Sequence, residues 1–303
     1  MSRMRSHAQS EASTASIVVV GSLAARPRAA QAVDNVLPGT TTNWRTRFWR
    51  IGGALLLVLL LAVLFAARAD AQPQIKVHCE IYATNYVDPI AFADHLHHQI
   101  GNTSTTNNST GNSLLNNHST SCNEGWFTSA GWFPVERNES VKGVNVYYRA
   151  PGDQRTIKAI PTGLQLLATE QKYSCGGNTV FSATPPYGCR DTWATSVSFP
   201  DCINTTRLAD EATNAVNRRN GVCPSTHPYR IPKISYLVMH NDGWVTNPLQ
   251  VSAGVNAWAD YTFMHADYFA ANQPVFNNEL LGLCLRDAPD RVTFASPRCG
   301  EGP

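Results

Sequence analysis

The sequence lacks the local signatures of several common enzyme classes and metal sites. None of its eight cysteines forms a C-x-x-C pair, which disfavours a structural zinc site of the zinc-finger kind. No phosphate-binding loop or dinucleotide fingerprint occurs. Ser252 lacks the G-x-S-x-G context of a serine hydrolase nucleophile. Nucleotide, dinucleotide and serine-based chemistry are therefore disfavoured.

Long apolar runs are also scarce, and the single long run, residues 51–67, follows a basic flank that contains Arg45, Arg47 and Arg50. The small-x-small sequence at 69–71 comes next, which completes the three parts of a secretory signal. We therefore interpret residues 45–71 as a signal peptide cleaved after Ala71, or alternatively as an uncleaved anchor that spans the membrane through residues 51–67.

The segment before this run, residues 1–44, is polar and of low complexity, and we expect it to be a disordered N-terminal extension. Both interpretations of the apolar run place the C-terminal part outside the cytoplasm, since a basic flank stays inside. The predicted localisation is secreted, or membrane-anchored and facing outward. Membrane contact is expected only through the N-terminal segment, if it stays uncleaved.

Basic charge is concentrated in the leader and is scarce in the exported part. Residues 1–71 hold eight Arg and three acidic residues, so 16 basic and 19 acidic residues remain in 72–303, a net charge of −3. A nucleic-acid-binding domain needs a concentrated basic face. We therefore expect no nucleic-acid partner.

All eight cysteines lie in residues 72–303, which are long enough for one domain with a sizeable core. An even number of cysteines confined to an exported region predicts disulfides in an oxidising compartment. Eight cysteines allow 105 pairings, and spacing alone does not choose among them. We favour short-range closures such as Cys175–Cys189 and Cys202–Cys223.

The exported part alternates short β-type segments with Pro- and Gly-rich turns, a pattern typical of a mainly β domain. We predict an irregular, β-sandwich-like single domain stabilised by disulfides, with a few short helices. The polar stretch 101–121 is expected to be a long loop, with Leu114-Leu115 as its one apolar break. The predicted strands cover 75–86, 144–148, 155–160, 192–199 and 234–239, and the predicted helices cover 204–220 and 279–285.

Titratable residues gather in two short segments far apart in the chain. His95 and His97 are two residues apart, so they share one face of an extended segment, and His265 and Asp267 repeat this spacing. We predict that the fold joins the two pairs in one site, with Asp88 as a further catalytic candidate. Asp94 and His98 are interpreted as surface groups.

Aromatic residues suggest where a ligand would bind. Two Gly-Trp-Phe triplets place Trp126 and Trp132 six residues apart, and Tyr148 follows downstream. Aromatic faces bind the apolar faces of sugars, so these three are the candidate substrate-binding residues. The alternative is that they are core aromatics around a turn.

Several short motifs occur in an order that resembles a known family. They are Asp88-Pro89-Ile90, His95-Leu96-His97, Trp132-Phe133-Pro134, Phe199-Pro200-Asp201-Cys202, Cys223-Pro224-Ser225-Thr226-His227-Pro228 and His265-Ala266-Asp267-Tyr268. This series resembles a family of secreted bacterial and fungal proteins catalogued as a domain of unknown function (DUF). Its members are often joined to cell-wall or sugar-binding modules.

The resemblance implies a site at His95, His97, His265 and Asp267, without an established reaction. The sequence also departs from the family pattern. Ile203 replaces a usual tryptophan, and Ala271-Asn272-Gln273 stands where Gly-Trp-Asp is usual. The His227 position in the C-P-x-x-H-P motif is a second-tier candidate.

Three interpretations of the His/Asp residues stay open. His95, His97, His265 and Asp267 can supply three or four ligands to a divalent metal ion such as zinc, which would activate water. Without metal, a histidine can act as general base, with Asp267 or Asp88 orienting it. The third interpretation is a structural polar network.

The function that we predict is a secreted carbohydrate-active hydrolase acting on cell-wall or extracellular polysaccharide through the His/Asp site, with or without the help of a metal ion. The alternative is a non-catalytic protein that binds cell-wall glycan and holds a structural His/Asp network. A cluster of titratable groups favours the enzyme, because such groups are typical of catalytic sites.

Overall fold

The structure is a computed structural model that describes residues 73–90, 95–136, 140–168, 170–176, 181–241, 250–252, 258–260, 265–286 and 299. The predicted N-terminal extension, at 1–44, and the predicted signal or anchor, at 45–71, lie outside these residues. Within them, no helix is long and apolar enough to cross a membrane.

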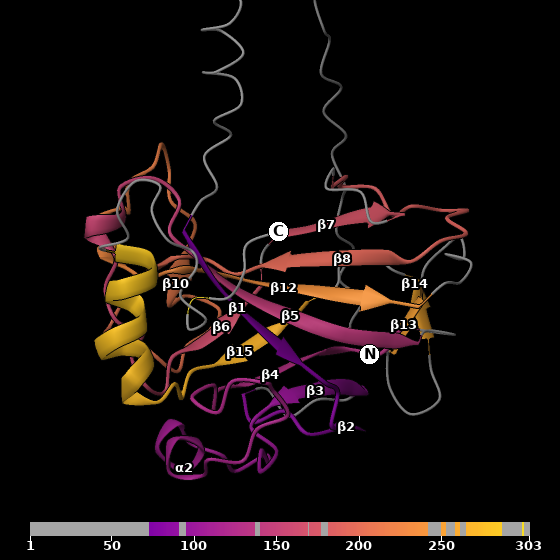
Figure 1. The fold of residues 1–303 in the computed structure, drawn as a ribbon, viewed down its shortest axis with the longest axis horizontal. Helices are drawn as coiled ribbons and strands as arrows, with labels where there is room; N and C mark the ends of the chain where they lie inside the picture. The colour runs from indigo at the N-terminus through magenta and orange to yellow at the C-terminus, as the bar shows by residue number, and fades with distance from the viewer. Residues whose placement is uncertain are drawn as a thin grey trace, which may run out of the picture. The chain divides into compact units, whose positions relative to one another are not determined.

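The described chain is mainly β, as predicted. One of its sheets, sheet A, is five-stranded and antiparallel (Figure 1), and residues such as Val77, Val146 and Tyr236 extend from its strands into the main core. Its strands in spatial order are β1 (Gln74–Cys79), β5 (Val141–Arg149), β12 (Lys233–His240), β8 (Trp193–Ser198) and β7 (Glu170–Cys175). The predicted strands at 144–148, 192–199 and 234–239 correspond to β5, β8 and β12.

A second five-stranded antiparallel sheet, sheet B, carries the His and Asp residues. Its strands in spatial order are β2 (Ala83–Asn85), β3 (His97–Gly101), β4 (Ala130–Pro134), β15 (Asp267–Phe269) and β6 (Gln165–Leu167). The segment predicted as one strand at 75–86 divides between the sheets, since β1 belongs to sheet A and β2 to sheet B.

The remaining elements are short. Their bounds are β9 (Cys202–Ile203), β10 (Ala215–Val216) and β11 (Tyr229–Arg230) in a three-stranded sheet, and β13 (Gln250–Ser252) with β14 (Trp258–Asp260) in a pair. The helical elements are α2 (Gly111–Asn116), the 3₁₀ turn η1 (Gln154–Thr156) and the π-helix η2 (Phe276–Arg286). The predicted helix at 279–285 lies within η2.

The two large sheets pack face to face through aromatic side chains. Residues directly opposite one another on neighbouring strands point to the same face, and Ile100, Gly131 and Tyr268 form such a row on the inner face of sheet B. The Tyr236 hydroxyl of β12 reaches across and donates to the backbone oxygen of Asp267 at 3.0 Å. A Cβ on Gly131 would stand 2.3 Å from that hydroxyl oxygen, so the close approach of the sheets requires glycine there.

The outer face of sheet B is covered by the polar segment that we expected to be a loop. Thr110 and Ser113 cap the helix α2 reciprocally, and Leu114 is 1% exposed. It belongs to a second apolar cluster, separate from the main core, with Ala130, Trp132, Phe269 and Ala271. The single apolar break in a Ser- and Asn-rich segment thus supplies the contact that packs it onto the sheet.

Four disulfides stabilise the domain, as the even number of cysteines predicts. The short-range pairs Cys175–Cys189 and Cys202–Cys223 are confirmed. The remaining pairs are Cys79–Cys122 and Cys284–Cys299. Disulfides are typical of an extracellular or otherwise oxidising environment.

The helix predicted at 204–220 is wrong. The segment is a hairpin, in which β9 pairs with β10 and the backbone N–H of Asn204 donates to the Asn214 oxygen at 2.7 Å. The buried Asn214 amide donates to the backbone oxygens of Leu208 and Gln165, and such side-chain bonds compete with helix formation. The strand predicted at 155–160 is also wrong, because η1 occupies its start.

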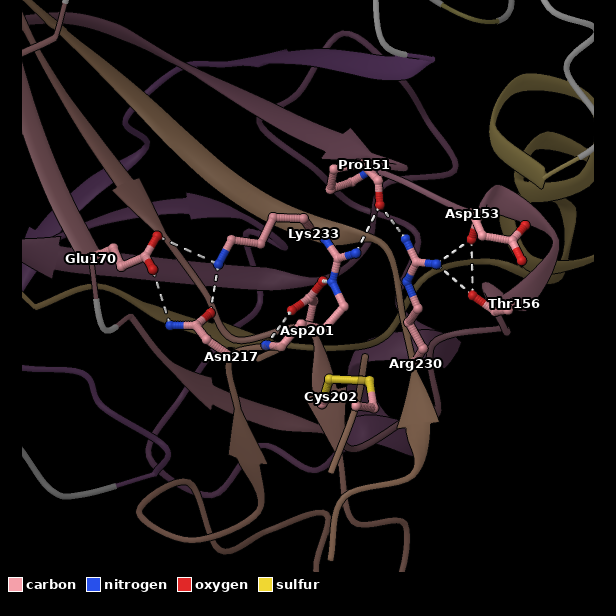
Figure 2. Close-up of polar contacts among 11 residues, drawn as sticks. Pro151, Asp153, Thr156, Glu170, Asp201, Cys202, Asn217, Arg230 and Lys233 are labelled. Carbon is pink, nitrogen blue, oxygen red and sulfur yellow. Dashed lines mark hydrogen bonds and ion pairs between the residues drawn. A yellow bond between two sulfur atoms is a disulfide. The ribbon is translucent and has the colours of Figure 1, made fainter. Parts of the chain in front are cut away.

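A polar network anchors the base of this hairpin (Figure 2). The Arg230 guanidinium donates to the Pro151 oxygen at 2.5 Å, and also to the Asp153 oxygen and the Thr156 hydroxyl. The Lys233 ammonium donates to the Asn217 side chain at 2.7 Å. These contacts tie β10 and β11 to sheet A and to the turn after β5.

Candidate metal centre

The strand order of sheet B brings the two distant His segments to the same end of the sheet. Both β3 and β15 pair antiparallel with β4, so they run parallel to each other and start at the same end. His97 pairs with Pro134, and Asp267 pairs with Trp132, which places position 265 level with Pro134. The backbones there are two strand spacings apart, roughly 10 Å, a gap that two imidazole side chains span.

The H-x-H segment is held extended by backbone bonds on both sides. The Val135 N–H donates to the Leu96 oxygen at 3.1 Å, and the Leu96 N–H donates to the Ser252 hydroxyl at 3.0 Å. His95 and His97 therefore project to the same side, with ring centroids 4.4 Å apart. Ser252 supports the backbone of the site by accepting this bond.

Three imidazole nitrogens converge at this end of the sheet. The His265 Nε2 lies 3.3 Å from the His95 Nε2 and 3.2 Å from the His97 Nε2. Each residue of the trio offers a nitrogen within 4.8 Å of the others, which makes His95, His97 and His265 a group able to hold a metal ion. We call this group the histidine trio.

The environment of His97 keeps its ring neutral. Burial, together with neighbouring His95 and His265, lowers the pKa of His97 to about 2. A neutral imidazole has a lone pair on one nitrogen, which is the form that ligates metals. Its Nδ1 is buried and has no hydrogen-bond partner among the described residues.

Two of the three nitrogen separations in the trio fit a tetrahedral zinc ion. With Zn–N bonds of 2.0–2.1 Å, the nitrogens of two ligands in a tetrahedron lie about 3.3–3.4 Å apart. The separations of His265 from His95 and from His97, 3.3 and 3.2 Å, are close to that value. Hydrogen bonding alone cannot satisfy three converging nitrogens well, because each neutral imidazole offers a single donor and a single acceptor.

His98, the next residue in the strand, faces the other way. Its ring packs against Phe133 at 5.5 Å and its Nδ1 lies 2.9 Å from the Thr84 hydroxyl. Burial and the neighbouring His240 lower the pKa of His98 to about 4. His98 is therefore partly buried on the inner side, whereas we had interpreted it as a surface group. Asp94 lies outside the described residues.

Asp267 borders the trio and is 3% exposed. Its Oδ2 lies 3.7 Å from the His265 Nε2. Burial, with Glu211 and Asp88 nearby, raises the pKa of Asp267 well above the usual value of a carboxyl. Asp88 is itself buried and accepts from the Ile90 N–H, so the structure brings this predicted residue to the same region.

Glu211 is the residue of this region that sequence reasoning missed. Burial and nearby Asp88 raise the pKa of Glu211, and Glu211 in turn helps to raise the pKa of Asp267. The residue comes from the β9–β10 hairpin, 56 positions before Asp267. Only the tertiary docking of that hairpin brings the two carboxyls together, and the sequence around Glu211 carries no motif that indicates it.

The predicted substrate-binding aromatics are buried or partly buried, whereas a sugar-stacking platform needs exposed rings. Trp132 and Tyr148 have 0% exposure, so neither ring has a face open to a sugar in this structure. Trp126 is partly buried and stacks on Phe276, with ring centroids 5.0 Å apart. Their alternative interpretation, core aromatics, matches these positions.

Trp132 nevertheless has a place beside the site. It is the cross-strand neighbour of both Gln99 and Asp267, on the outer face of sheet B. A fully buried indole next to Asp267 adds to the apolar surroundings of that carboxyl. His227 contacts the β9–β10 hairpin, with its Nε2 2.9 Å from the Thr213 backbone oxygen.

Comparison with known proteins gives a family without an assigned activity. No curated protein and no solved structure gives a significant match to this chain. A family model described as "Domain of unknown function (DUF1996)" matches residues 85–271, a span that includes the histidine trio, Asp267, Asp88 and Glu211. Because the match covers more than half of the sequence, the chain belongs to the DUF1996 family.

Proposed function

We propose that the histidine trio binds a zinc ion and that the protein is a secreted, metal-dependent hydrolase acting on extracellular polysaccharide. The observation that carries the proposal is the agreement between the nitrogen separations, 3.2 and 3.3 Å, and the edge of a zinc tetrahedron. This agreement is reached by residues 168 and 170 positions apart.

The number of protein ligands favours catalysis over a structural role. Structural zinc sites have four protein ligands, whereas catalytic sites have three and keep one position open for water or substrate. Among the residues that the structure describes, His95, His97 and His265 form a group of three, and the His265 side chain is 27% exposed. Solvent therefore reaches the edge of the trio.

When bound at three imidazoles, zinc supplies a Lewis acid and lowers the pKa of a coordinated water to about 7. The residues of the chain supply the rest. His95, His97 and His265 hold the ion in their neutral form. Asp267 holds a carboxyl beside His265 that can accept or return a proton, and Asp88 adds negative charge that favours a cation.

The choice of polysaccharide rests on the setting of the domain. Four disulfides fit an extracellular compartment, and the related proteins described above are often joined to cell-wall or sugar-binding modules. The alternative, a non-catalytic glycan-binding protein, depended on an exposed aromatic platform. The burial of Trp132 and Tyr148 weakens that support.

The test combines metal analysis with turnover. The exported protein is purified, its zinc content is measured by mass spectrometry, and release of reducing ends is followed on a panel of cell-wall polysaccharides. We expect one zinc per chain, activity that a chelator abolishes and zinc restores, and loss of both in His265→Ala. His98→Ala is the matched control, since His98 neighbours the trio and faces the other side.

Two outcomes oppose the proposal in different ways. A protein that neither contains zinc nor takes it up has no metal centre. A zinc-loaded protein that is retained on a glycan, yet releases no reducing ends from any member of the panel, favours the binding protein instead.

A further inference from the structure

Ser252 joins three backbone segments at the end of sheet B. It is the last residue of β13, pairs with Trp258 of β14, and is 5% exposed. Its hydroxyl accepts from the Leu96 N–H at 3.0 Å, and its own N–H donates to the Val135 oxygen at 2.8 Å. The β13–β14 pair therefore meets the ends of β3 and β4 through Ser252.

These two bonds take the place of a ladder bond between β3 and β4. Leu96 and Val135 are the next pair after His97 and Pro134, and the Val135 N–H donates to the Leu96 oxygen at 3.1 Å. In a regular antiparallel ladder, such a pair exchanges two direct bonds. Here the path from the Leu96 N–H back to the Val135 oxygen runs through the hydroxyl and the N–H of Ser252. Ser252 is thus inserted on one side of this pair.

The insertion lies between the two histidines of the H-x-H segment. His95 and His97 flank Leu96, and their ring centroids are 4.4 Å apart. Residues two apart on a regular strand are separated by about 6.7 Å along its axis, so the two rings lean toward each other. Their Nε2 atoms lie 3.3 and 3.2 Å from the His265 Nε2. An interruption of the ladder re-aims the side chains beside it, as β-bulges do next to active sites.

From this geometry we infer that Ser252 is a positioning residue: its hydroxyl fixes the Leu96 backbone, and thereby the angle at which His95 and His97 meet the metal ion. The inference rests on the proposed metal centre, and it gives Ser252 a role other than that of a nucleophile. Groups that orient metal ligands without touching the metal typically weaken metal affinity by about 10–100-fold when they are removed.

The test reads the metal directly in the exported, disulfide-bonded protein. Zinc affinity is measured by competition with a chromophoric chelator, and the visible absorption spectrum of the cobalt-substituted protein reports the geometry of the ligands. Ser252→Ala keeps the N–H and loses the acceptor, so we expect it to bind zinc about 10–100-fold more weakly and to change the cobalt spectrum. Ser252→Thr keeps a hydroxyl and should return both measurements toward those of the wild type.

Ser121→Ala is the matched control. Ser121 accepts from the N–H of Gly101, the last residue of β3, at 3.0 Å, the same distance at which Ser252 accepts from the residue before the first. Both substitutions remove an acceptor from a backbone N–H of the same strand, but Ser121 lies at the end of β3 away from the trio. Ser121→Ala should therefore bind zinc as the wild type does.

Two variants of similar shape cover the case in which Ser252→Ala does not fold. Ser252→Val has nearly the outline of Ser252→Thr but lacks the hydroxyl. Weaker zinc binding by Ser252→Val than by Ser252→Thr supports the positioning role, and equal binding by the two folded variants contradicts it.

The remaining outcomes separate the two claims. Wild-type affinity and an unchanged cobalt spectrum in folded Ser252→Ala overturn the positioning role and leave the metal centre standing. An equal loss of affinity in Ser121→Ala assigns the effect to β3 as a whole and also overturns that role. Failure of the wild-type protein to bind zinc or cobalt overturns the metal centre, and the positioning role with it.

Discussion

Neighbouring residues in the strands of sheet B point to opposite faces of the sheet. One face belongs to the core and the other to the candidate site. In β3, His97 and Gln99 face outward, while His98 and Ile100 face sheet A. In β15, Asp267 faces outward and Tyr268 faces inward. The inner row belongs to the main core, and the outer row ends in the histidine trio.

This difference between the two faces explains how the packed core can restrain the strands that carry the site. The trio lies at the ends of strands whose inner residues are locked between two sheets, and Tyr236 of sheet A donates to the backbone of Asp267 itself. Sites built on strands hold geometry more closely than sites built on loops. The inner face therefore stabilises the positions of the histidines on the opposite face.

The largest expected effect lies on the outer face. Substituting His97→Ala removes one of three ligands, and the zinc affinity should fall by more than about 100-fold, beyond the range of residues that act through a ligand. Folding of the metal-free protein should be retained. Chelator competition measures the affinity, and circular dichroism checks the fold. An affinity equal to that of His98→Ala would remove His97 from the ligand set.

The next effect tests the apolar end of the outer face. Leu114→Ala should lower the free energy of unfolding by about 3 kcal/mol, because the side chain is buried between α2 and the sheet. Leu115, the next residue, is only partly buried, so Leu115→Ala should cost clearly less. Urea denaturation of both variants gives the comparison, and equal losses would mean that α2 does not pack as described.

The inner face should make the fold sensitive to acid. His240 stacks on Trp193 with ring centroids 3.6 Å apart, and burial lowers its pKa to about 4, against a smaller opposing influence of Glu136. The unfolded chain takes up this proton near pH 6.5 and the folded chain only near pH 4, so acidification favours unfolding.

We expect His240 to account for about 2–3 kcal/mol of lost stability between pH 7 and 4.5. His240→Phe keeps an aromatic ring on Trp193 without a titrating group. Urea denaturation at several pH values, in the presence of chelator, should show a weaker pH dependence in this variant. His98, with a pKa lowered to about 4, should account for part of the remaining dependence. Parallel pH profiles of variant and wild type would contradict the prediction.

The smallest expected effect probes the contact between the sheets. Gly131→Ala should destabilise the fold by about 2 kcal/mol, since its new Cβ must displace the Tyr236 hydroxyl. Gly125→Ala is the control, because a Cβ there meets nothing within 4 Å. Thermal unfolding compares the two. Once folded, both variants should bind zinc as the wild type does.

Local patterns predicted the fold where one face of a strand is apolar. The run 234–239 alternates and became most of β12, and the spacing of His95 and His97 predicted their shared face. The prediction failed at 204–220, where a helix about 24 Å long would leave too little chain to join Cys202 and Cys223. The chain between the two cysteines is too short for the predicted helix and the predicted disulfide to exist together. The structure contains the disulfide.

Other features depend on tertiary contacts that no local pattern contains. Trp126 and Trp132 sit in identical Gly-Trp-Phe triplets, yet Trp132 is fully buried beneath α2 and Trp126 only partly. The influence of Glu211 on the pKa of Asp267 arises from a hairpin that docks on β6. The sequence indicated the trio because His95 and His97 are two residues apart, as are His265 and Asp267. Residues at this spacing lie on the same face of a strand.

The strand order also sets when the site can form. His97 and His265 are 168 residues apart, and they meet only when both β3 and β15 have paired with β4. Contacts of such long range form late and slow folding, because closing a long loop costs entropy before any contact rewards it. The trio is therefore complete only in the finished domain, and the proposed metal centre would be filled after folding, once the disulfides have closed.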